Sequence, residues 1–232
     1  MGFNCLVLVN PKEFPCEEAS RRASGAIDVL DKAIVVDSLD EAIAESQMVV
    51  GTSVRERQIT WPTKTPKASA EEVLNRLNKT INGKVSILFG RERTGLENEE
   101  LDKANWQIRI PANPGYSSLN LASAIQLIAY ELNCTFLQEM SEMTGHEARL
   151  LDNHDAQTGV QKRQRLATNA EMQSYYTHLE RVLSDLDFIK VKPPQKLMRK
   201  IQRLYNRGEV SFEELQILRG ILTATEKVIK KG

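Results

Sequence analysis

Two segments of the sequence lead from an apolar run into a turn that is rich in glycine or serine. Residues 88–95 read Leu-Phe-Gly-Arg-Glu-Arg-Thr-Gly, and residues 110–121 read Ile-Pro-Ala-Asn-Pro-Gly-Tyr-Ser-Ser-Leu-Asn-Leu. We interpret each as a buried strand that runs into a turn and then a helix. Two such turns can meet beside one ligand, so the pattern predicts a pocket for a nucleotide-like cofactor.

The first 140 residues alternate short apolar runs with amphipathic stretches. Strands are predicted over residues 5–9, 34–36, 48–50, 85–89 and 106–110. Helices are predicted over residues 39–46, 69–77, 98–103 and 118–137. Ser69 and Glu72 are predicted to form a capping box at the start of the second of these helices. This alternation predicts an α/β fold with a parallel sheet.

The remaining residues have a different pattern. Residues 141–167 lack a sustained apolar period, which indicates a linker. Residues 168–232 read as three helices, with capping boxes beginning at Thr168 and Ser211 and a middle helix that starts at Pro193 or Pro194. We therefore predict an α/β domain over 1–140, a linker over 141–167 and a small all-α domain over 168–232. Tyr175 and Tyr176 could stack on bases, although filling the helical core is the favoured reading.

The net charge of zero hides an asymmetry. Residues 1–159 carry 16 basic and 23 acidic side chains (16 − 23 = −7), and residues 160–232 carry 15 and 8 (15 − 8 = +7). A basic helical module suggests contact with a polyanion, because Lys and Arg neutralise nucleic-acid phosphates. Attraction between the two halves of the chain is the alternative.

Several classes of site are not expected. No apolar run approaches the roughly 20 residues that span a bilayer, and no signal segment is recognised, so a cytoplasmic protein is the default. The histidines (His146, His154, His178) are scattered, and no metal site is expected. The three cysteines (Cys5, Cys16, Cys134) are expected to be free, buried thiols. Residues 90–95 have the glycine spacing of a phosphate loop, but Leu96 and Glu97 stand where Lys and Ser or Thr are required.

The sequence resembles the SpoU-like branch of the SPOUT RNA methyltransferases. The resemblance rests on Leu-Val-Asn-Pro at 8–11, Asp-Ser-Leu-Asp-Glu-Ala at 37–42, Val-Val-Gly-Thr-Ser at 49–53, the segments 88–95 and 110–121, and the basic tail. It implies a SPOUT domain with a C-terminal trefoil knot that binds S-adenosyl-L-methionine, and a homodimer. It also implies 2′-O-methylation of a pyrimidine ribose, cytidine or uridine, at position 32 of the tRNA anticodon loop.

The resemblance also implies site residues. Cofactor contacts fall at Thr52, Ser53, Val54, Gly90, Ile110, Ser117, Ser118 and Leu119. Supporting catalytic roles fall to Glu92, Ser118 and Asn120. RNA contacts are expected at Arg55, Arg57, Arg91 and Arg93 in the first domain and at Lys196, Arg199, Lys200 and Arg203 in the tail, with solvated surface side chains as the alternative reading. Plain helix capping is the alternative for the serines, and tight-turn geometry is the alternative for Gly90 and Gly95.

One departure from the family concerns the first residues. Met1-Gly2-Phe3 aligns with the end of the family's first helix, so the family's first strand, loop and catalytic arginine have no counterpart in this sequence. The expectation is either a methyltransferase of uncertain activity as written or a non-catalytic RNA-binding protein that keeps the fold.

Overall fold

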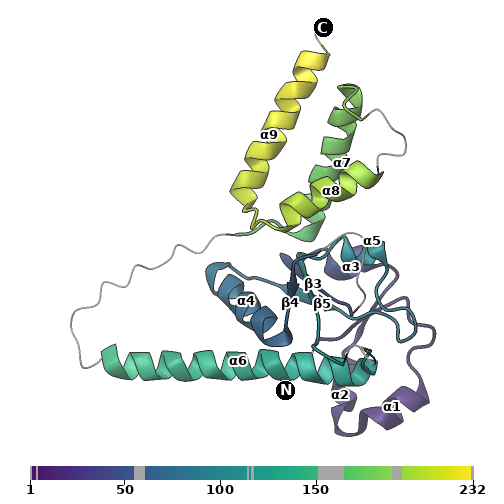
Figure 1. Ribbon diagram of the computed structural model, residues 1–232, viewed down its shortest axis with the longest axis vertical. Helices are drawn as coiled ribbons and strands as arrows, with labels where there is room; N and C mark the ends of the chain where they lie inside the picture. Colours follow the sequence, from purple (N-terminus) through teal and green to yellow (C-terminus); the bar gives the residue numbers. More distant parts are fainter. Residues whose placement is uncertain are drawn as a thin grey trace.

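The computed structural model describes residues 2–3, 5–54, 61–113, 115, 118–150, 165–189 and 195–230, with only the backbone described for 142–150 and 195. Figure 1 shows an α/β body below a helical bundle, with one long helix along the bottom of the body. The fold class predicted from the sequence, a parallel-sheet domain with a small all-α domain after it, is confirmed.

The strands form two parallel sheets. They are β1 (Val7–Val9), β2 (Ile34–Val36), β3 (Met48–Thr52), β4 (Thr63–Lys64), β5 (Val85–Leu88) and β6 (Trp106–Ile108). β1 pairs with β2, and the second sheet has the order β4-β6-β3-β5. β3 therefore lies between β5 and β6, with Val50 opposite both Ile87 and Trp106.

Side chains of β3 alternate between two apolar layers, as the period of two in a strand requires. Met48 and Val50 belong to a core with α4 (Pro66–Lys79) and α6 (Leu121–Leu150). Val49 belongs to a second core with α3 (Leu39–Ile43) and α5 (Asn98–Leu101). Because both faces of β3 are covered, its first three residues, Met48–Val50, are all apolar and buried.

The long helix differs from its prediction. It was expected over residues 118–137, but it begins at Leu121 and continues to Leu150, so residues 141–150 of the expected linker are helical. Ile128 and Leu132 are buried against α4. Ile125 and Phe136 share the helical spacing of Ile128 and Leu132, but both are exposed.

The capping box predicted at Ser69 is wrong. α4 begins at Pro66 with Thr65 as its N-cap, whose hydroxyl accepts a hydrogen bond from the Ala68 amide. Ser69 lies inside the helix and is buried, and its hydroxyl accepts a 2.8 Å hydrogen bond from Trp106 Nε1. The hydroxyl of Ser69 therefore binds a side chain from the sheet and does not cap the helix.

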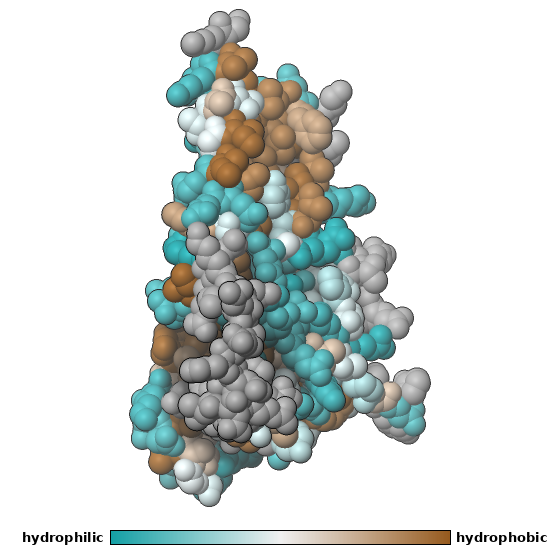
Figure 2. All heavy atoms as spheres, turned by 90° about the vertical axis from the view of Figure 1, so that its left-hand side faces the viewer, coloured by the Kyte–Doolittle hydropathy of each residue, from teal (hydrophilic) through white to brown (hydrophobic). Residues whose placement is uncertain are grey.

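The bundle consists of α7 (Asn169–Asp185), α8 (Gln195–Asn206) and α9 (Phe212–Ile229). The capping boxes predicted at Thr168 and Ser211 are confirmed. Tyr175 and Tyr176 are buried in the bundle core, which confirms the favoured reading. Ile221 of α9 is exposed although Leu218 and Leu222 beside it pack in the bundle core, and Figure 2 shows apolar surface over the bundle at the top of the view.

A short helical segment between β1 and β2 completes the body. It comprises α1 (Glu17–Ala23), a 3₁₀ turn (Ser24–Ala26) and α2 (Ile27–Asp31), and none of these elements has a buried residue. The expectation of buried cysteines is wrong, because Cys5 is exposed and Cys16 and Cys134 are only half-buried. Cys5 and Cys134 have apolar neighbours in sequence, but neither belongs to the core clusters of the described residues.

We predict that Ser69→Ala destabilises the protein by about 1–3 kcal/mol, because it leaves the buried Trp106 Nε1–H without an acceptor. Thermal and urea denaturation measure this loss. Ser184→Ala, at an exposed position of α7, is the matched control and should change stability by less than about 0.5 kcal/mol. Equal stability of the two variants would contradict the role given to the Ser69 hydroxyl.

Candidate functional site

The carboxyl ends of β3, β5 and β6 lie side by side, because the three strands are parallel neighbours. Two hydrogen bonds fix the start of the loop after β3. Thr52 Oγ1 donates to the Leu88 carbonyl of β5 at 2.8 Å, and the Ser53 amide donates to the Ile108 carbonyl of β6 at 3.1 Å. Open parallel sheets bind ligands at such an edge. The structure thus places Thr52, Ser53 and Val54 beside the strand ends that lead to Gly90 and Ile110.

The turn after β5 depends on two glycines. A Cβ atom on Gly90 would lie 2.1 Å from backbone atoms of Gly95 and Leu96, which no side chain tolerates. Gly95 has a φ of +67°, and its amide donates to the Arg91 carbonyl at 2.7 Å. The turn geometry alone explains both glycines, so cofactor contact at Gly90 stays a prediction.

The side chains of this turn differ in their surroundings. Arg91 pairs with Glu97 and Glu100 across the turn, whereas Glu92 and Arg93 are exposed. The Thr94 hydroxyl is buried, and it has no hydrogen-bond partner among the described residues. A buried hydroxyl of this kind is an available donor or acceptor for a ligand at the same edge of the sheet.

The N-cap residue of α6 is Asn120 and not one of the predicted serines. The Asn120 side-chain oxygen accepts from the Ala122 amide at 2.9 Å, and its carbonyl accepts from Ala124. Ser118 is exposed and lies before the helix, Leu119 is half-buried, and Ile110 packs against the core. The predicted start of the helix at Ser118 is therefore wrong. Ser117, Arg55 and Arg57 lie outside the described residues.

The basic residues of α8 that are predicted to contact RNA differ in exposure and in their partners. Lys196 and Lys200 are exposed, but Arg199 forms an ion pair with the buried Asp102 carboxylate of the body. Burial raises the pKa of Asp102, and the Arg199 guanidinium partly offsets that rise. Arg203 lies with its guanidinium 4.5 Å from the centre of the Trp61 ring. Arg199 thus has a structural partner, and its contact with RNA stays a prediction.

Asn105 and Asn206 join the bundle to the central strand. Asn105 Oδ1 accepts from the Val49 amide of β3, and its Nδ2 donates to the Asn206 carbonyl, each at 2.8 Å. The Asn206 side chain donates to the Asp102 carbonyl and accepts from the Tyr176 hydroxyl. We call these two residues the amide clasp. It connects α8 directly to the strand that carries Thr52 and Ser53.

A second contact between the two units joins the start of α7 to the residues just after α3. The amides of Asn169 and Ala170, at the start of α7, donate to the carbonyls of Ser46 and Ala44, just after α3. These amides have no acceptor within their own helix, so the contact satisfies polar groups on both sides. The amide clasp and this contact hold the bundle on the body at two separate places.

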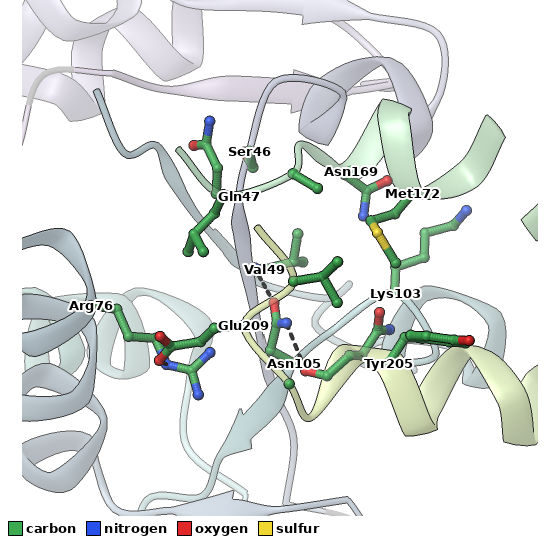
Figure 3. A pocket seen from close by; sticks show the side chains of 15 residues that line it. Ser46, Gln47, Val49, Arg76, Lys103, Asn105, Asn169, Met172, Tyr205 and Glu209 are labelled. Carbon is green, nitrogen blue, oxygen red and sulfur yellow. Dashed lines mark hydrogen bonds and ion pairs between the residues drawn. The ribbon is translucent and has the colours of Figure 1, made fainter. Parts of the chain in front are cut away.

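The cavity in Figure 3 lies at this junction. Its lining includes Gln47, Lys103 and Asn105 of the body and Asn169, Tyr205 and Glu209 of the bundle. Its volume of about 40 Å³ suits one or two waters but not a nucleotide. The cofactor expected from the sequence therefore does not belong there.

Sequence reasoning missed Asp102, Asn105 and Asn206. Asp102 was included in a predicted helix only as one of its polar residues, and its burial depends on a helix almost a hundred residues later. No sequence pattern marked Asn206, apart from its position two residues before Gly208. Their partners are 101 to 104 residues apart in sequence, beyond the reach of any local pattern.

The described part of the chain contains one histidine side chain and three cysteines. No cluster of three or more His, Cys, Asp or Glu side chains suited to a metal ion occurs there. His178 lies 3.2 Å from Glu226, and the other two histidine side chains fall outside the described part. None of the described helices combines the length and the apolar character needed to cross a membrane.

An ionic network supports the junction from the side of α4. Glu72 accepts from Lys64 at 2.8 Å and from Arg76 at 2.6 Å, and Arg76 also pairs with Glu209 of the bundle at 3.1 Å. The hydrogen bond from Lys64 lowers the pKa of Glu72 below its ordinary value of 4.5, and Arg76 acts in the same direction against the opposing effect of burial.

Comparison with known proteins gives matches to both units. Residues 1–130 match the SpoU rRNA Methylase family, and residues 170–232 match the family described as tRNA methyltransferase TrmJ, C-terminal domain. The chain is 42% identical over 230 residues to the tRNA (cytidine/uridine/adenosine-2′-O-)-methyltransferase TrmJ of Pseudomonas aeruginosa, covering 99% of this chain and 86% of that protein. It is 40% identical to the tRNA (cytidine/uridine-2′-O-)-methyltransferase TrmJ of Photorhabdus laumondii, covering 100% and 89%.

Solved structures give the same result. The crystal structure of TrmJ from Z. mobilis ZM4 superposes with a TM-score of 0.76 at 31% identity, and the match covers 97% of this chain and 88% of that one. A probable methylase family protein from Haemophilus influenzae superposes with a TM-score of 0.56 at 38% identity, covering 99% and 86%. The similarity therefore includes both the body and the bundle.

We predict that Glu72→Gln destabilises the protein by about 1–2 kcal/mol at neutral pH, through the loss of charge-assisted hydrogen bonds. The carboxylate binds its proton less tightly in the folded state, so its contribution is complete above pH 4.5 and is lost as the pH falls through the lowered pKa. Melting temperatures measured from pH 7 to pH 3 should therefore converge for variant and parent at the acid end. A constant difference over this range would contradict the assignment.

We predict that Gly90→Ala lowers the melting temperature more than Gly95→Ala does. The first substitution drives a Cβ into the backbone, whereas the second meets no atom within 4 Å and carries only the strain of a positive φ, about 1 kcal/mol. Thermal denaturation without added ligand compares the two variants. The reverse order would show that the turn does not have the described geometry.

Proposed function

The chain belongs to the SpoU rRNA Methylase family and carries a TrmJ-type C-terminal domain, and from this we propose that it methylates the ribose 2′-hydroxyl of a nucleotide in tRNA. The observation that carries the proposal is identity of about 40% to tRNA 2′-O-methyltransferases along almost the whole chain, body and bundle together. A match limited to the body would have left the RNA substrate open.

The proposed methyl donor is S-adenosyl-L-methionine. Its proposed site is the edge where β3, β5 and β6 end, which offers the Thr52–Val54 loop, the side-chain-free Gly90 and the unpartnered Thr94 hydroxyl. These features fit a ligand with an adenosine and an amino-acid end, because such a ligand needs close backbone approach and hydrogen-bonding groups. When bound, the donor supplies an electrophilic methyl group on a sulfonium.

The chain's own part in the reaction is proposed to be mainly positioning. In-line displacement requires the 2′-hydroxyl, the methyl group and the sulfur to be aligned. Ser118 and Asn120, before α6, lie in the segment that follows β6 and are assigned supporting roles with Glu92 of the turn after β5. Arg93, exposed in the same turn, is assigned to an RNA phosphate, as a forked guanidinium suits. Arg55, Arg57 and Ser117, which lie outside the described residues, keep the roles given by the resemblance.

The proposed target is cytidine or uridine at position 32 of the anticodon loop. The Pseudomonas aeruginosa relative is named as a cytidine, uridine and adenosine methyltransferase, whereas the Photorhabdus laumondii relative is named for cytidine and uridine. Discrimination against adenosine is thus part of the proposal and a separate outcome of its test.

We further propose a knotted, homodimeric enzyme that acts in the cytoplasm. The exposed apolar side chains of α6 support association through that helix. They are Ile125, Tyr130, Phe136, Leu137 and Met140. The trefoil knot is carried over from the resemblance and would involve the segment between β6 and α6.

The expected result is incorporation of a labelled methyl group from S-adenosyl-L-methionine into tRNA, with the modified linkage resistant to alkali because its 2′-hydroxyl is blocked. Transcripts with C, U or A at position 32 measure nucleotide choice, and a transcript with 2′-deoxyribose at that position is the control and should accept no label. Salt-sensitive tRNA binding without incorporation would instead favour a non-catalytic RNA-binding protein.

A further inference from the structure

The outer side of α9 carries an apolar stripe that the described part of the chain leaves uncovered. Ile217, Ile221 and Val228 are 65%, 57% and 72% exposed. Every exposed residue of α9 between Glu214 and Lys227 is uncharged. Figure 2, which looks onto the side of the bundle where α9 lies in Figure 1, shows apolar surface there. The helix therefore presents to water a side that suits contact with protein.

This stripe is additional to the one that holds α9 in the bundle. Leu215 and Leu222 are buried on the inner side of the helix, and Leu218 packs beside them. A helix at the surface of a bundle needs one apolar side, and its opposite side is ordinarily polar. Because α9 has an apolar side in each direction, its pattern is typical of a helix with a second partner.

The spacing of the outer stripe is that of a coiled-coil seam. Four apolar residues follow one another at intervals of four, three and four, which are the d, a, d and a positions of a heptad repeat: Ile217, Ile221, Ala224 and Val228. Gly220 lies at the adjoining g position, and a Cβ there would meet no atom within 4 Å. The helix surface is low at this point, so a second helix can approach closely.

The charges at the two ends of the stripe indicate which helix it fits. Glu213 and Lys227 are exposed, and they lie seven residues before and seven residues after Gly220, along nearly one line of the helix. In an antiparallel pair of α9 helices centred on Gly220, Glu213 of each copy faces Lys227 of the other. A parallel pair would bring like charges to the same end. The stripe is therefore complementary to itself, as a twofold contact between identical chains requires.

We propose that α9 binds the α9 helix of a second copy of this chain, antiparallel and centred near Gly220. The contact lies in the bundle, is distinct from association through α6 of the body, and involves neither the methyl donor nor tRNA. The stripe from Ile217 to Val228 extends about 17 Å along the helix. A contact of this length is smaller than the roughly 800 Å² per partner of a typical stable interface. It is thus weak alone and stronger where another contact already joins the copies.

The first test is a zero-length cross-link between a carboxyl and an amino group. Glu213 and Lys227 are fourteen residues apart in one helix, or about 21 Å, so a carbodiimide cannot join them within a single chain. We expect mass spectrometry of the treated full chain to find the two residues joined. Ile221→Glu, which places a charge in the seam, should abolish this product. Thr223→Glu, at an exposed position of α9 away from the stripe, is the matched control and should retain it.

The second test reverses the two charges in separate chains. Glu213→Lys alone, or Lys227→Glu alone, sets like charges against each other in an antiparallel pair, and each should weaken association by about fivefold or more. An equimolar mixture of the two variants restores both pairs of opposite charge and should associate within about twofold of the parent. Sedimentation velocity at several protein concentrations measures association, and the melting temperature of each variant reports damage to α9 itself.

Absence of the cross-link from the full chain would overturn the proposal, and so would a cross-link that persists in Ile221→Glu. Weakening by each reversal without recovery in the mixture would also overturn it, in favour of a partner of different chemistry. Association equal to that of the parent in both separate reversals would show that α9 takes no part. Loss of methyl transfer with the cross-link intact would contradict the proposed enzyme activity and leave the α9 contact standing.

Discussion

The parallel pairing of β3 with β5 on one side and β6 on the other determines where a ligand can bind. Buried on both faces and bonded along both edges, β3 cannot shift its register without losing Met48, Val49 and Val50 from the two cores. The pairing brings together three strand ends, at Thr52, Leu88 and Ile108, that are well separated in sequence. The loops that the sequence singled out are neighbours for this reason, and their own composition matters only after the sheet has placed them.

The junction between the body and the bundle is built largely from half-buried polar groups around the buried Asp102 carboxylate. Such groups add little net stability, but each requires its particular partner, because an unpaired buried amide or carboxylate is costly. Asp102 with Arg199 and Asn105 with Asn206 therefore specify one way of seating the bundle, where an apolar contact would accept several. An RNA bound by α8 then has a defined position relative to β3.

Sequence patterns correctly predicted the features that depend on interactions between residues close in sequence. The strand of apolar residues at 48–50 and the helix caps at Thr168 and Ser211 were found because their signals lie within a few residues. The same reasoning failed at Ser69, whose capping-box spacing is genuine but whose hydroxyl is taken by Trp106. It also could not separate Arg199 from Lys200, adjacent basic residues of which one meets a buried carboxylate and the other meets water. The loops of the candidate site could be predicted from the resemblance and from the order of the strands. The junction between body and bundle could be predicted from neither.

The amide clasp has a consequence for how this protein can be rebuilt. Asn206 contributes its carbonyl to the body and its side chain to both the body and Tyr176 of the bundle, so the boundary between the units does not coincide with the boundary between their interactions. A chimera that joins this body to the bundle of a relative would need an asparagine at the end of the middle helix and an arginine seven positions before it. Without them, the orientation of the two units would depend on the contact at the start of α7 and on the pair between Arg76 and Glu209.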